Sequence, residues 1–250
     1  MDLQLKGKTA LVTGASAGIG RAIAIELAKE VVNLVVTGRR REELQKLSDE
    51  VAKLGAPRPG IVAHDAMDDG YVDAIVKQCE ATFGAVVILM TNAGGSRAFG
   101  KDATDEQWDE AFTLNFTRHR QLTLRFLPGM QAKQWGRVIY ITGKQEPDHV
   151  NGAFCAKAAL TAFSKGLSRE VGKQGITVNC IGPGRIMSDQ IRRNYTPEYR
   201  AWQSEHEIPM GRYGEPEDLA VLAVFLASPR AGYITGTVSP VDGGLRRYQY

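Results

Sequence analysis

A glycine-rich segment near the start of the chain has the residue types and spacing of a phosphate-binding turn. Its glycines follow the pattern Gly-x-x-x-Gly-x-Gly, between an apolar β-branched run and a helical pattern. Glycine lets the backbone bend tightly and approach a pyrophosphate, and the N–H groups at the following helix N-terminus bind anions. We therefore expect five residues to bind the pyrophosphate of a dinucleotide: Gly14, Ser16, Gly18, Ile19 and Gly20.

Such a turn needs a strand before it and a helix after it, and the sequence repeats that alternation throughout. Apolar β-branched runs predict strands buried on both faces at Thr9–Thr13, Leu34–Thr37, Ile61–Ala63, Val86–Thr91, Val138–Thr142, Thr177–Ile181 and Val238–Val241. Apolar residues at helical spacing predict helices at Arg41–Leu54, Tyr71–Phe83, Trp108–Leu127, Phe154–Val171 and Pro216–Ala227.

This alternation predicts an α/β fold with a doubly wound parallel sheet of the Rossmann type, as a single domain over residues 1–250. The segment 182–214 carries Pro183, Pro197 and Pro209. We expect it to be an irregular insertion that serves as a substrate loop.

Further motifs follow the later strands. Asn92-Ala93-Gly94 comes after the fourth strand, Pro183-Gly184 after the sixth, and Val241-Asp242-Gly243-Gly244 near the end. With these motifs, nearly the whole chain resembles the short-chain dehydrogenases/reductases, in particular members similar to β-ketoacyl-carrier-protein reductases. The resemblance implies a nicotinamide cofactor across the carboxyl ends of the strands, with further contacts from Asp65, Asn92, Ala93, Gly94, Lys157, Pro183 and Gly184.

The end of the second strand predicts which cofactor is bound. An NAD site presents an acidic residue to the ribose 2′-hydroxyl, whereas an NADP site uses arginine. Here Gly38 stands where the family has an aspartate, and Arg39 follows it. A guanidinium pairs well with a 2′-phosphate, so we expect NADP(H) to be favoured over NAD(H).

The resemblance also exposes two departures from the family's chemistry. In that family a serine polarises the substrate carbonyl, a tyrosine transfers its proton, and a lysine four residues later binds the nicotinamide ribose. Asn115 and Lys157 match the family's active-site asparagine and lysine, but Gly143 and Ala153 occupy the serine and tyrosine positions. The segment between those two positions is about three residues shorter than usual.

Other residues are candidates to replace the missing proton donor. A histidine has a suitable intrinsic pKa, and a lysine beside the cleft can also carry a proton. The possible substitutes are Lys144 and His149, followed by Cys155, Tyr140 and Tyr195. Thr142 lies next to Gly143, but alternation along a strand turns its side chain away from the site.

The four histidines lack the spacing of metal ligands, so no metal is predicted.

These observations leave three hypotheses for function. The first is an NADP(H)-dependent oxidoreductase that acts on a carbonyl or hydroxyl group of a small molecule with an atypical proton donor. The second is a catalytically impaired nucleotide-binding protein, and the third is a lyase or isomerase that retains the cofactor. Arg97, Lys101, Lys144, Arg185 and Arg192-Arg193 are expected to rim the cleft, which suggests an anionic substrate.

Composition limits the other partners. A net charge of +3 is too small to indicate nucleic acid, and the longest apolar run, Ala220–Ala227, is too short to span a membrane. No signal peptide is evident and the three cysteines are far apart, so we expect a cytoplasmic protein. The resemblance implies homodimers through the fourth and fifth helices, or homotetramers that add the last helix and tail.

Overall fold

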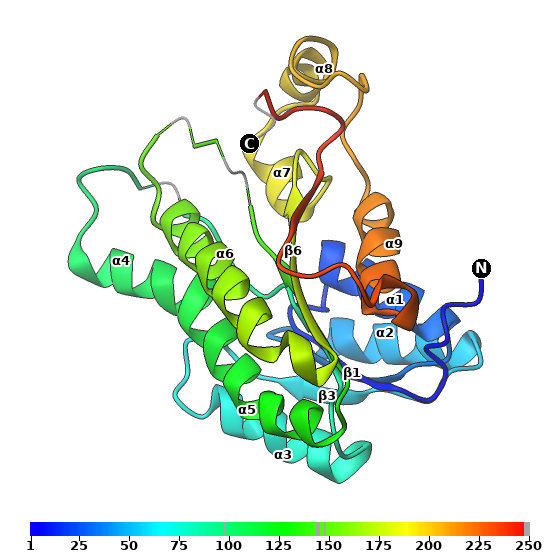
Figure 1. Ribbon diagram of the computed structural model, residues 1–250. Coiled ribbons are helices and arrows are strands. Elements are labelled where there is room, and N and C mark those ends of the chain that lie inside the picture. Colours follow the sequence, from blue (N-terminus) through cyan, green and yellow to red (C-terminus); the bar gives the residue numbers. More distant parts are fainter. Residues whose placement is uncertain (98, 144–145, 148, 248–250) are drawn as a thin grey trace.

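In the computed structural model, which describes residues 1–97, 99–143, 146–147 and 149–247, seven parallel strands form one sheet (Figure 1). Their order is β3-β2-β1-β4-β5-β6-β7, so the chain changes direction across the sheet between β1 and β4. Ligands of such sheets bind at the carboxyl ends of the strands where the direction changes. The strands are β1 Thr9–Val12, β2 Asn33–Gly38, β3 Gly60–Ala63, β4 Ile88–Thr91, β5 Gly136–Ile141, β6 Ile176–Pro183 and β7 Val238–Val241. The predicted doubly wound parallel sheet is confirmed.

Helices cover both faces of this sheet (Figure 1). Helices α1, α2 and α9 pack on one face, and α3, α5 and α6 pack on the other. The helices are α1 Gly18–Lys29, α2 Arg41–Lys53, α3 Tyr71–Thr82, α4 Asp105–Phe112, η1 Thr113–Thr117, α5 Arg118–Ala132, α6 Gly152–Val171, η2 Gly172–Gln174, α7 Asp189–Asn194, α8 Pro197–His206, α9 Pro216–Ala227 and η3 Pro229–Ala231.

Strand β1 shows how the sequence pattern builds two cores. Ala10 and Val12 are buried against α1 and α9, whereas Leu11 is buried on the opposite face against the α3 side. Successive side chains of a strand point to opposite faces, so an unbroken apolar run supplies both cores at once. The carboxyl end of β1, which the glycine turn follows, is thereby packed on both faces of the sheet.

The expectation of an irregular segment at 182–214 is wrong, because this stretch contains α7 and α8. Pro197 is the first residue of α8, where a missing N–H leaves no hydrogen bond unmade. The Thr196 side chain accepts a hydrogen bond from the Tyr199 N–H and so caps the same helix. A proline that begins a helix was therefore mistaken for a sign of irregular structure.

The predicted helix Trp108–Leu127 is also interrupted. The chain runs from α4 through one π-helical turn, η1, and then into α5. Asn115 lies inside that turn and is completely buried. Such π-helical turns are frequent at functional sites.

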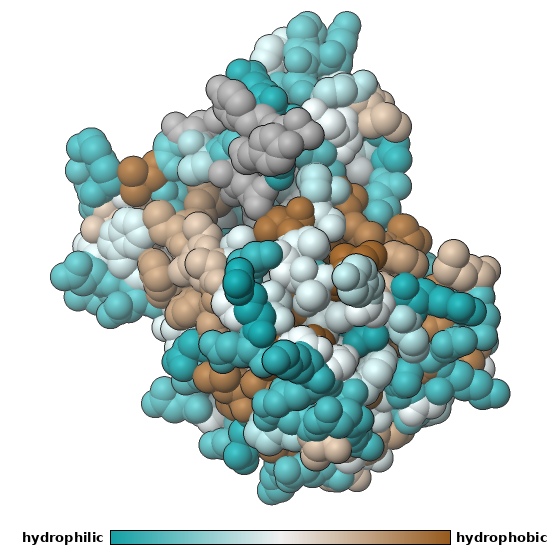
Figure 2. Space-filling model, in the orientation of Figure 1, coloured by the Kyte–Doolittle hydropathy of each residue, from teal (hydrophilic) through white to brown (hydrophobic). Residues whose placement is uncertain are grey.

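The surface seen in Figure 2 is mostly hydrophilic, with separate hydrophobic patches. One pale-brown area lies over the region where Figure 1 shows α4 and α6. Among the helices of the described residues, none is both long enough and apolar enough to cross a membrane.

Candidate active site

The glycine turn between β1 and α1 is packed so closely that two of its glycines have no room for a side chain. A Cβ atom on Gly14 would lie 2.9 Å from the Cα atom of Ala93, and one on Gly20 would overlap the carbonyl oxygen of Gly14. Gly18 has a φ of +54°, and a Cβ atom there would meet nothing within 4 Å. The turn is therefore anchored on one side and open at Gly18.

The first turn of α1 presents backbone N–H groups to this open side. Its N-cap, Ala17, has no side-chain oxygen that could accept a hydrogen bond from them, and the first turn holds no acidic residue. Uncapped N–H groups and the positive end of the helix dipole attract an anion. These residues therefore fit the pyrophosphate of a dinucleotide.

The segment Asn92–Gly94 joins the glycine turn to the middle of the site. The N–H groups of Asn92 and Ala93 donate to Thr13 Oγ1 at 2.9 and 3.0 Å. A Cβ atom on Gly94 would lie 2.8 Å from Asn115 Oδ1, so a larger residue would displace the buried asparagine. These three residues thus fix the distance between β1 and η1.

Two arginines surround the end of β2. The Arg39 side chain is 76% exposed, and its Nη1 lies 3.9 Å from Asp65 Oδ2. Arg40 donates from Nη2 to the carbonyl oxygen of Ser16 at 3.2 Å. A Cβ atom on Gly38 would lie 3.1 Å from Ser16 Oγ, so glycine leaves space beside that hydroxyl group. The site is therefore basic and open where a ribose 2′-phosphate would bind.

Sequence reasoning named Arg39 here but missed Arg40. Arg40 approaches the glycine turn, and its Nη1 also lies 3.9 Å from Asp189 Oδ2 on α7. The available signal was its position directly after Arg39. Consecutive residues that leave a strand point in different directions, and here they reach two sides of one site.

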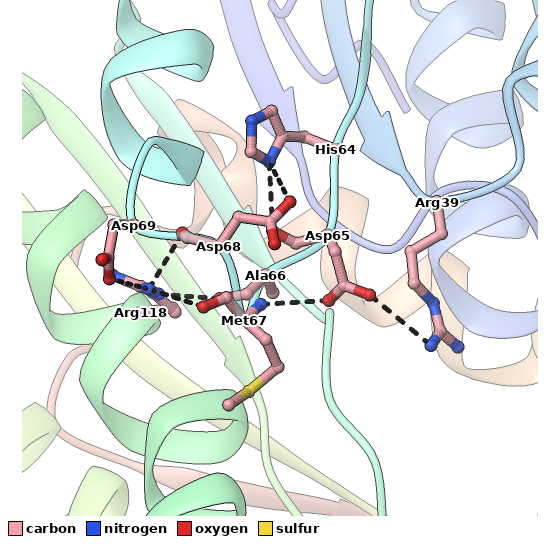
Figure 3. A network of polar contacts seen from close by, with 8 residues as sticks. All are labelled: Arg39, His64, Asp65, Ala66, Met67, Asp68, Asp69 and Arg118. Carbon is pink, nitrogen blue, oxygen red and sulfur yellow. Dashed lines mark hydrogen bonds and ion pairs between the residues drawn. The ribbon is translucent and has the colours of Figure 1, made fainter.

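The segment after β3 carries Asp65 (Figure 3). Asp65 Oδ1 accepts a hydrogen bond from the Met67 N–H at 3.0 Å, which leaves Oδ2 facing Arg39. His64 Nδ1 lies 3.1 Å from the Asp65 carbonyl oxygen and 3.3 Å from Asp68 Oδ2. Asp65 is therefore held in a defined orientation beside the arginine, as its predicted contact with the adenine end requires.

The Asn115 side chain is fully occupied by backbone groups. Its Nδ2 donates to the carbonyl oxygens of Ala111 and Gly95, both at 2.9 Å, and its Oδ1 accepts from the Gly95 N–H at 3.2 Å. An amide with these three contacts fixes the loop after β4 against η1. This arrangement suits a positioning role for Asn115 rather than direct contact with a substrate.

Lys157 lies on α6 and reaches back to the end of β5. Its Nζ donates to the Thr142 carbonyl oxygen at 3.2 Å, and burial lowers the pKa of this amine to about 8. Ala153 stands one turn earlier on the same helix and is only 2% exposed. The amine that the resemblance assigns to the cofactor is thus present, without a phenol beside it.

Two residues near Lys157 are oriented away from the site. The Thr142 hydroxyl donates to the Ile181 carbonyl oxygen at 3.1 Å, as strand alternation predicts. Tyr140 is fully buried, its hydroxyl lies 2.7 Å from Thr123 Oγ1, and burial raises its pKa. Tyr140 is therefore wrong as a substitute proton donor, because a buried phenol bonded inside the core cannot reach a substrate.

A cavity of about 620 Å³ lies between α6 and the chain after β5. Lys157 lines it together with two other predicted substitutes, His149 and Cys155. The His149 ring lies 5.9 Å from the ring of Phe154, and Cys155 is exposed. Lys144 falls outside the described residues. The remaining lining residues are mostly apolar or small, with three polar ones: Thr142, Gly143, Pro147, Val150, Asn151, Phe154, Ala158 and Thr161.

Tyr195 and several basic residues lie in the other segments expected around the cleft. The guanidinium of Arg185 lies 5.7 Å from the Tyr195 ring and also bonds Glu207 at 3.0 Å. Arg97 bonds Glu110 at 2.5 Å, and Lys101 bonds its neighbour Asp102 at 2.8 Å. Much of the positive charge predicted for the rim is therefore paired with carboxylates.

His119 is a buried titratable residue that sequence reasoning did not single out. It is 4% exposed, and its Nε2 lies 3.1 Å from the Leu114 carbonyl oxygen of η1. Burial, with a smaller contribution from the charge of Lys157, lowers its pKa to about 4. His119 lies on the inner face of α5, and the sequence alone did not indicate that it would be buried there.

The chain is similar to known proteins over nearly its whole length. A family model described as enoyl-(acyl carrier protein) reductase matches residues 14–246. The 3-oxoacyl-[acyl-carrier-protein] reductase FabG of Pseudomonas aeruginosa is 35% identical over 247 residues, which cover 97% of this chain and 99% of that protein. The FabG protein of Escherichia coli is 37% identical over 248 residues, with 97% and 99% covered.

Two solved structures extend the likeness to the whole fold. L-sorbose reductase from Gluconobacter frateurii, in complex with NADPH and L-sorbose, has a TM-score of 0.93 at 33% identity and covers 99% of this chain and 100% of that one. A 7α-hydroxysteroid dehydrogenase, in complex with NADH and 7-oxo glycochenodeoxycholic acid, has a TM-score of 0.91 at 30% identity, with 97% and 96% covered. Since the family model spans most of the chain and the relatives span nearly all of it, this protein belongs to the short-chain dehydrogenase/reductase family of oxidoreductases.

Proposed function

We propose that the protein is an NADP(H)-dependent oxidoreductase that acts on a carbonyl or hydroxyl group of a small molecule, with Lys157 as its proton donor. The observation that carries this proposal is the position of the Lys157 amine. It lines a largely apolar cavity, has a pKa of about 8, and lies where the family's tyrosine is missing. A group with a pKa near the operating pH is an effective general acid.

The residues that would hold the cofactor lie at the carboxyl ends of β1, β2, β3, β4 and β6 and on α6. When bound, the cofactor would supply the hydride. Its pyrophosphate would meet the glycine turn, its adenine end Asp65, and its nicotinamide end Lys157. The remaining contacts are proposed from the resemblance: Asn92, Ala93, Gly94, Pro183 and Gly184.

Preference for NADP(H) rests on the end of β2. Gly38 leaves space beside Ser16 Oγ, the Arg40 guanidinium bonds the Ser16 carbonyl oxygen, and the Arg39 guanidinium is exposed beside Asp65. The relatives support either cofactor, since one structure holds NADPH and another NADH. A 2′-phosphate would accept charge-assisted hydrogen bonds from the arginines, whereas a 2′-hydroxyl carries no negative charge to pair with them.

Lys157 would act on the carbonyl oxygen of the substrate. Its Nζ carries three protons when charged, and one of them is donated to the Thr142 carbonyl oxygen. The others are available to the nicotinamide ribose and to an oxygen atom in the cavity. Loss of the tyrosine removes a factor of about 10²–10⁴ from the rate, so we expect slow turnover.

The substrate would bind in the cavity beside α6, and the segment 182–214 would serve as the substrate loop. The apolar lining favours a carbonyl compound with a hydrocarbon portion. Arg97, Lys101 and Arg185 are each paired with a carboxylate. Support for an anionic group on the substrate therefore comes from Arg192 and Arg193, which are exposed on α7.

The test is single-turnover oxidation of saturating NADPH with a panel of ketones and β-ketoacyl esters. We expect a slow rate that is constant below pH 8 and falls above it, because only the protonated amine donates. Lys157→Met should abolish this rate even at saturating NADPH, whereas His149→Ala should leave it nearly unchanged. A rate that survives in Lys157→Met, or is lost in His149→Ala, would contradict the assignment.

The same experiment separates the second candidate, a nucleotide-binding protein without turnover. This candidate is favoured by the absence of both a hydroxyl at 143 and a phenol at 153. It predicts tight binding of NADPH with no oxidation by any carbonyl compound. A product formed without net oxidation of NADPH would instead indicate the lyase or isomerase.

A further inference from the structure

Arg118 joins the first turn of α5 to the segment that follows β3, although 50 or more residues separate them along the chain. Its Nε donates to the Ala66 carbonyl oxygen at 2.7 Å, and its Nη2 donates to those of Asp68 and Met67 at 2.9 and 3.3 Å. Its Nη1 donates to Gln121 Oε1 at 3.0 Å. Figure 3 shows the guanidinium enclosed by the carbonyl groups of this segment.

This arrangement buries most of a charged side chain, and the carboxylate paired with it is fully exposed. The Arg118 side chain is 12% exposed, and the carboxylate of Asp69 lies 3.9 Å away, beyond hydrogen-bond distance. Burying a charge is unfavourable unless polar groups compensate it, and here three successive carbonyl oxygens do so. The planar guanidinium alone among side chains can span several acceptors in this way.

The carbonyl groups held by Arg118 belong to the residues directly after Asp65. Met67 accepts from Arg118 through its carbonyl oxygen and donates to Asp65 Oδ1 through its N–H. The orientation of Asp65, and with it the spacing between Asp65 Oδ2 and Arg39, therefore depends on Arg118. Figure 3 shows this continuous path from Arg118 through Met67 and Asp65 to Arg39.

Arg118 also directly follows η1, the turn that contains Asn115. Asn115 fixes Gly95 in the middle of the site, so one continuous helical region contacts both the middle and the adenine end. We propose that Arg118 is a positioning residue for cofactor binding, which holds the segment 66–68 so that Asp65 is oriented toward the adenine end. This inference rests on the proposed function, since it requires that a dinucleotide binds there.

The experiment measures dissociation constants of NADPH, NADH and adenosine 2′,5′-bisphosphate by titration calorimetry. The last of these carries only the adenine end. Arg118→Met keeps the aliphatic stem and removes the donors, Arg118→Lys keeps the charge without the planar fork, and Arg125→Met is a matched control on the exposed side of α5. Thermal melting of each variant accompanies the titrations.

We expect Arg118→Met to weaken all three ligands by about tenfold, which is the loss of one or two hydrogen bonds to a charged group. Arg118→Lys should recover only part of the loss, and Arg125→Met should bind as the wild type does. In the Arg118→Met background, Asp65→Asn should cost much less than it does alone, because Asp65 has already lost its orientation.

Some results would overturn the inference while leaving the proposed function intact. These are unchanged ligand binding in Arg118→Met, full recovery in Arg118→Lys, or strictly additive losses with Asp65→Asn. If Arg118→Met does not fold, the same comparisons are made with Arg118→Lys. A wild-type protein that binds neither NADPH nor NADH would instead contradict the proposed function.

Discussion

A Cβ atom on Gly143 would lie 3.1 Å from Cδ of Lys157 and 3.7 Å from its Nζ, so the lysine side chain occupies the space beside this glycine. The missing serine and the retained lysine are therefore linked. Glycine at 143 lets Lys157 lie close to β5, where its amine bonds the Thr142 carbonyl oxygen. The side chain that packs beside Gly143 therefore ends in an amine.

We predict that restoring the family's residues does not restore an ordinary reductase. Gly143→Ser should push the Lys157 side chain away, and a displacement of about 1 Å can cost 10²-fold in rate. Ala153→Tyr places a large ring at a buried position and should lower the melting temperature. NADPH oxidation and thermal melting of both variants and their combination test this, with Ala153→Ser as the small-residue control. Turnover at about 10 s⁻¹ in the double variant would contradict the prediction.

We predict that Arg39→Ala weakens NADPH about 10–100-fold and leaves NADH nearly unchanged, since only the 2′-phosphate pairs with the guanidinium. Arg40→Ala should give a smaller change, because its Nη2 is used by the Ser16 carbonyl oxygen. Titration calorimetry on both cofactors provides the measurement. Arg41→Ala, an exposed arginine on α2, is the control. Equal affinities of the wild type for the two cofactors would refute the claimed preference.

Much of the fold could be predicted because its signals are local. Every residue of the run Thr9–Val12 is buried, as in a strand that is covered on both faces. Pro216 begins α9, at a helix N-terminus where proline is tolerated. The glycine turn was also predictable. Glycine is needed at Gly14 and Gly20 because other backbone atoms occupy the space of a side chain.

What could not be predicted depends on contacts between distant segments. The turn η1 forms where Asn115 bonds Gly95, a contact that helical periodicity does not contain. Arg118 resembles any surface arginine until the segment after β3 folds over it. The burial of Tyr140 and its bond to Thr123 likewise appear only when α5 packs on β5, so its rejection as a proton donor needed the structure.

We predict that His119 makes the protein sensitive to acid. Its pKa is about 4 in the folded state against an ordinary 6.5, so between these values the unfolded chain binds more protons and stability falls as the pH falls. The loss between pH 6.5 and 4 is about 2–3 kcal/mol. Urea unfolding at pH 7, 6, 5 and 4 should show a shallower decline in His119→Phe than in the wild type. The exposed His206→Phe should follow the wild type, and identical slopes in all three proteins would refute the assignment.

We predict that the protein forms dimers through α4, α5 and α6, or tetramers that add α9 and the tail. Ala111 on α4 and Leu167 on α6 are buried within the subunit, so they are not available to a second copy. The exposed positions of α6 include the small residues Ala158, Ala162 and Gly166. Ala162→Arg should therefore reduce the mass measured by light scattering, whereas Ala81→Arg on α3 should not. A wild type that is monomeric at micromolar concentration would exclude this assembly.

The last prediction concerns how protonation of the Lys157 amine changes the stability of the folded protein with pH. Its pKa is about 8 in the folded protein against an ordinary 10.5, because burial disfavours the charged form. Below pH 8 both folded and unfolded states hold the proton, and the buried charge lowers stability by a constant amount.

Between pH 8 and 10.5 the folded state has lost this proton while the unfolded state retains it, so the wild type gains stability as the pH rises. Lys157→Met has no such group and should not show the gain. The variant should therefore melt a few degrees above the wild type at pH 7, and this difference should shrink as the pH approaches 10. Calorimetric melting across pH 7–10 measures it, with the exposed Lys165→Met as the control for a lost lysine charge. A Lys157→Met variant that melts below the wild type at pH 7, with a difference independent of pH, would show that the amine is not buried as a charge.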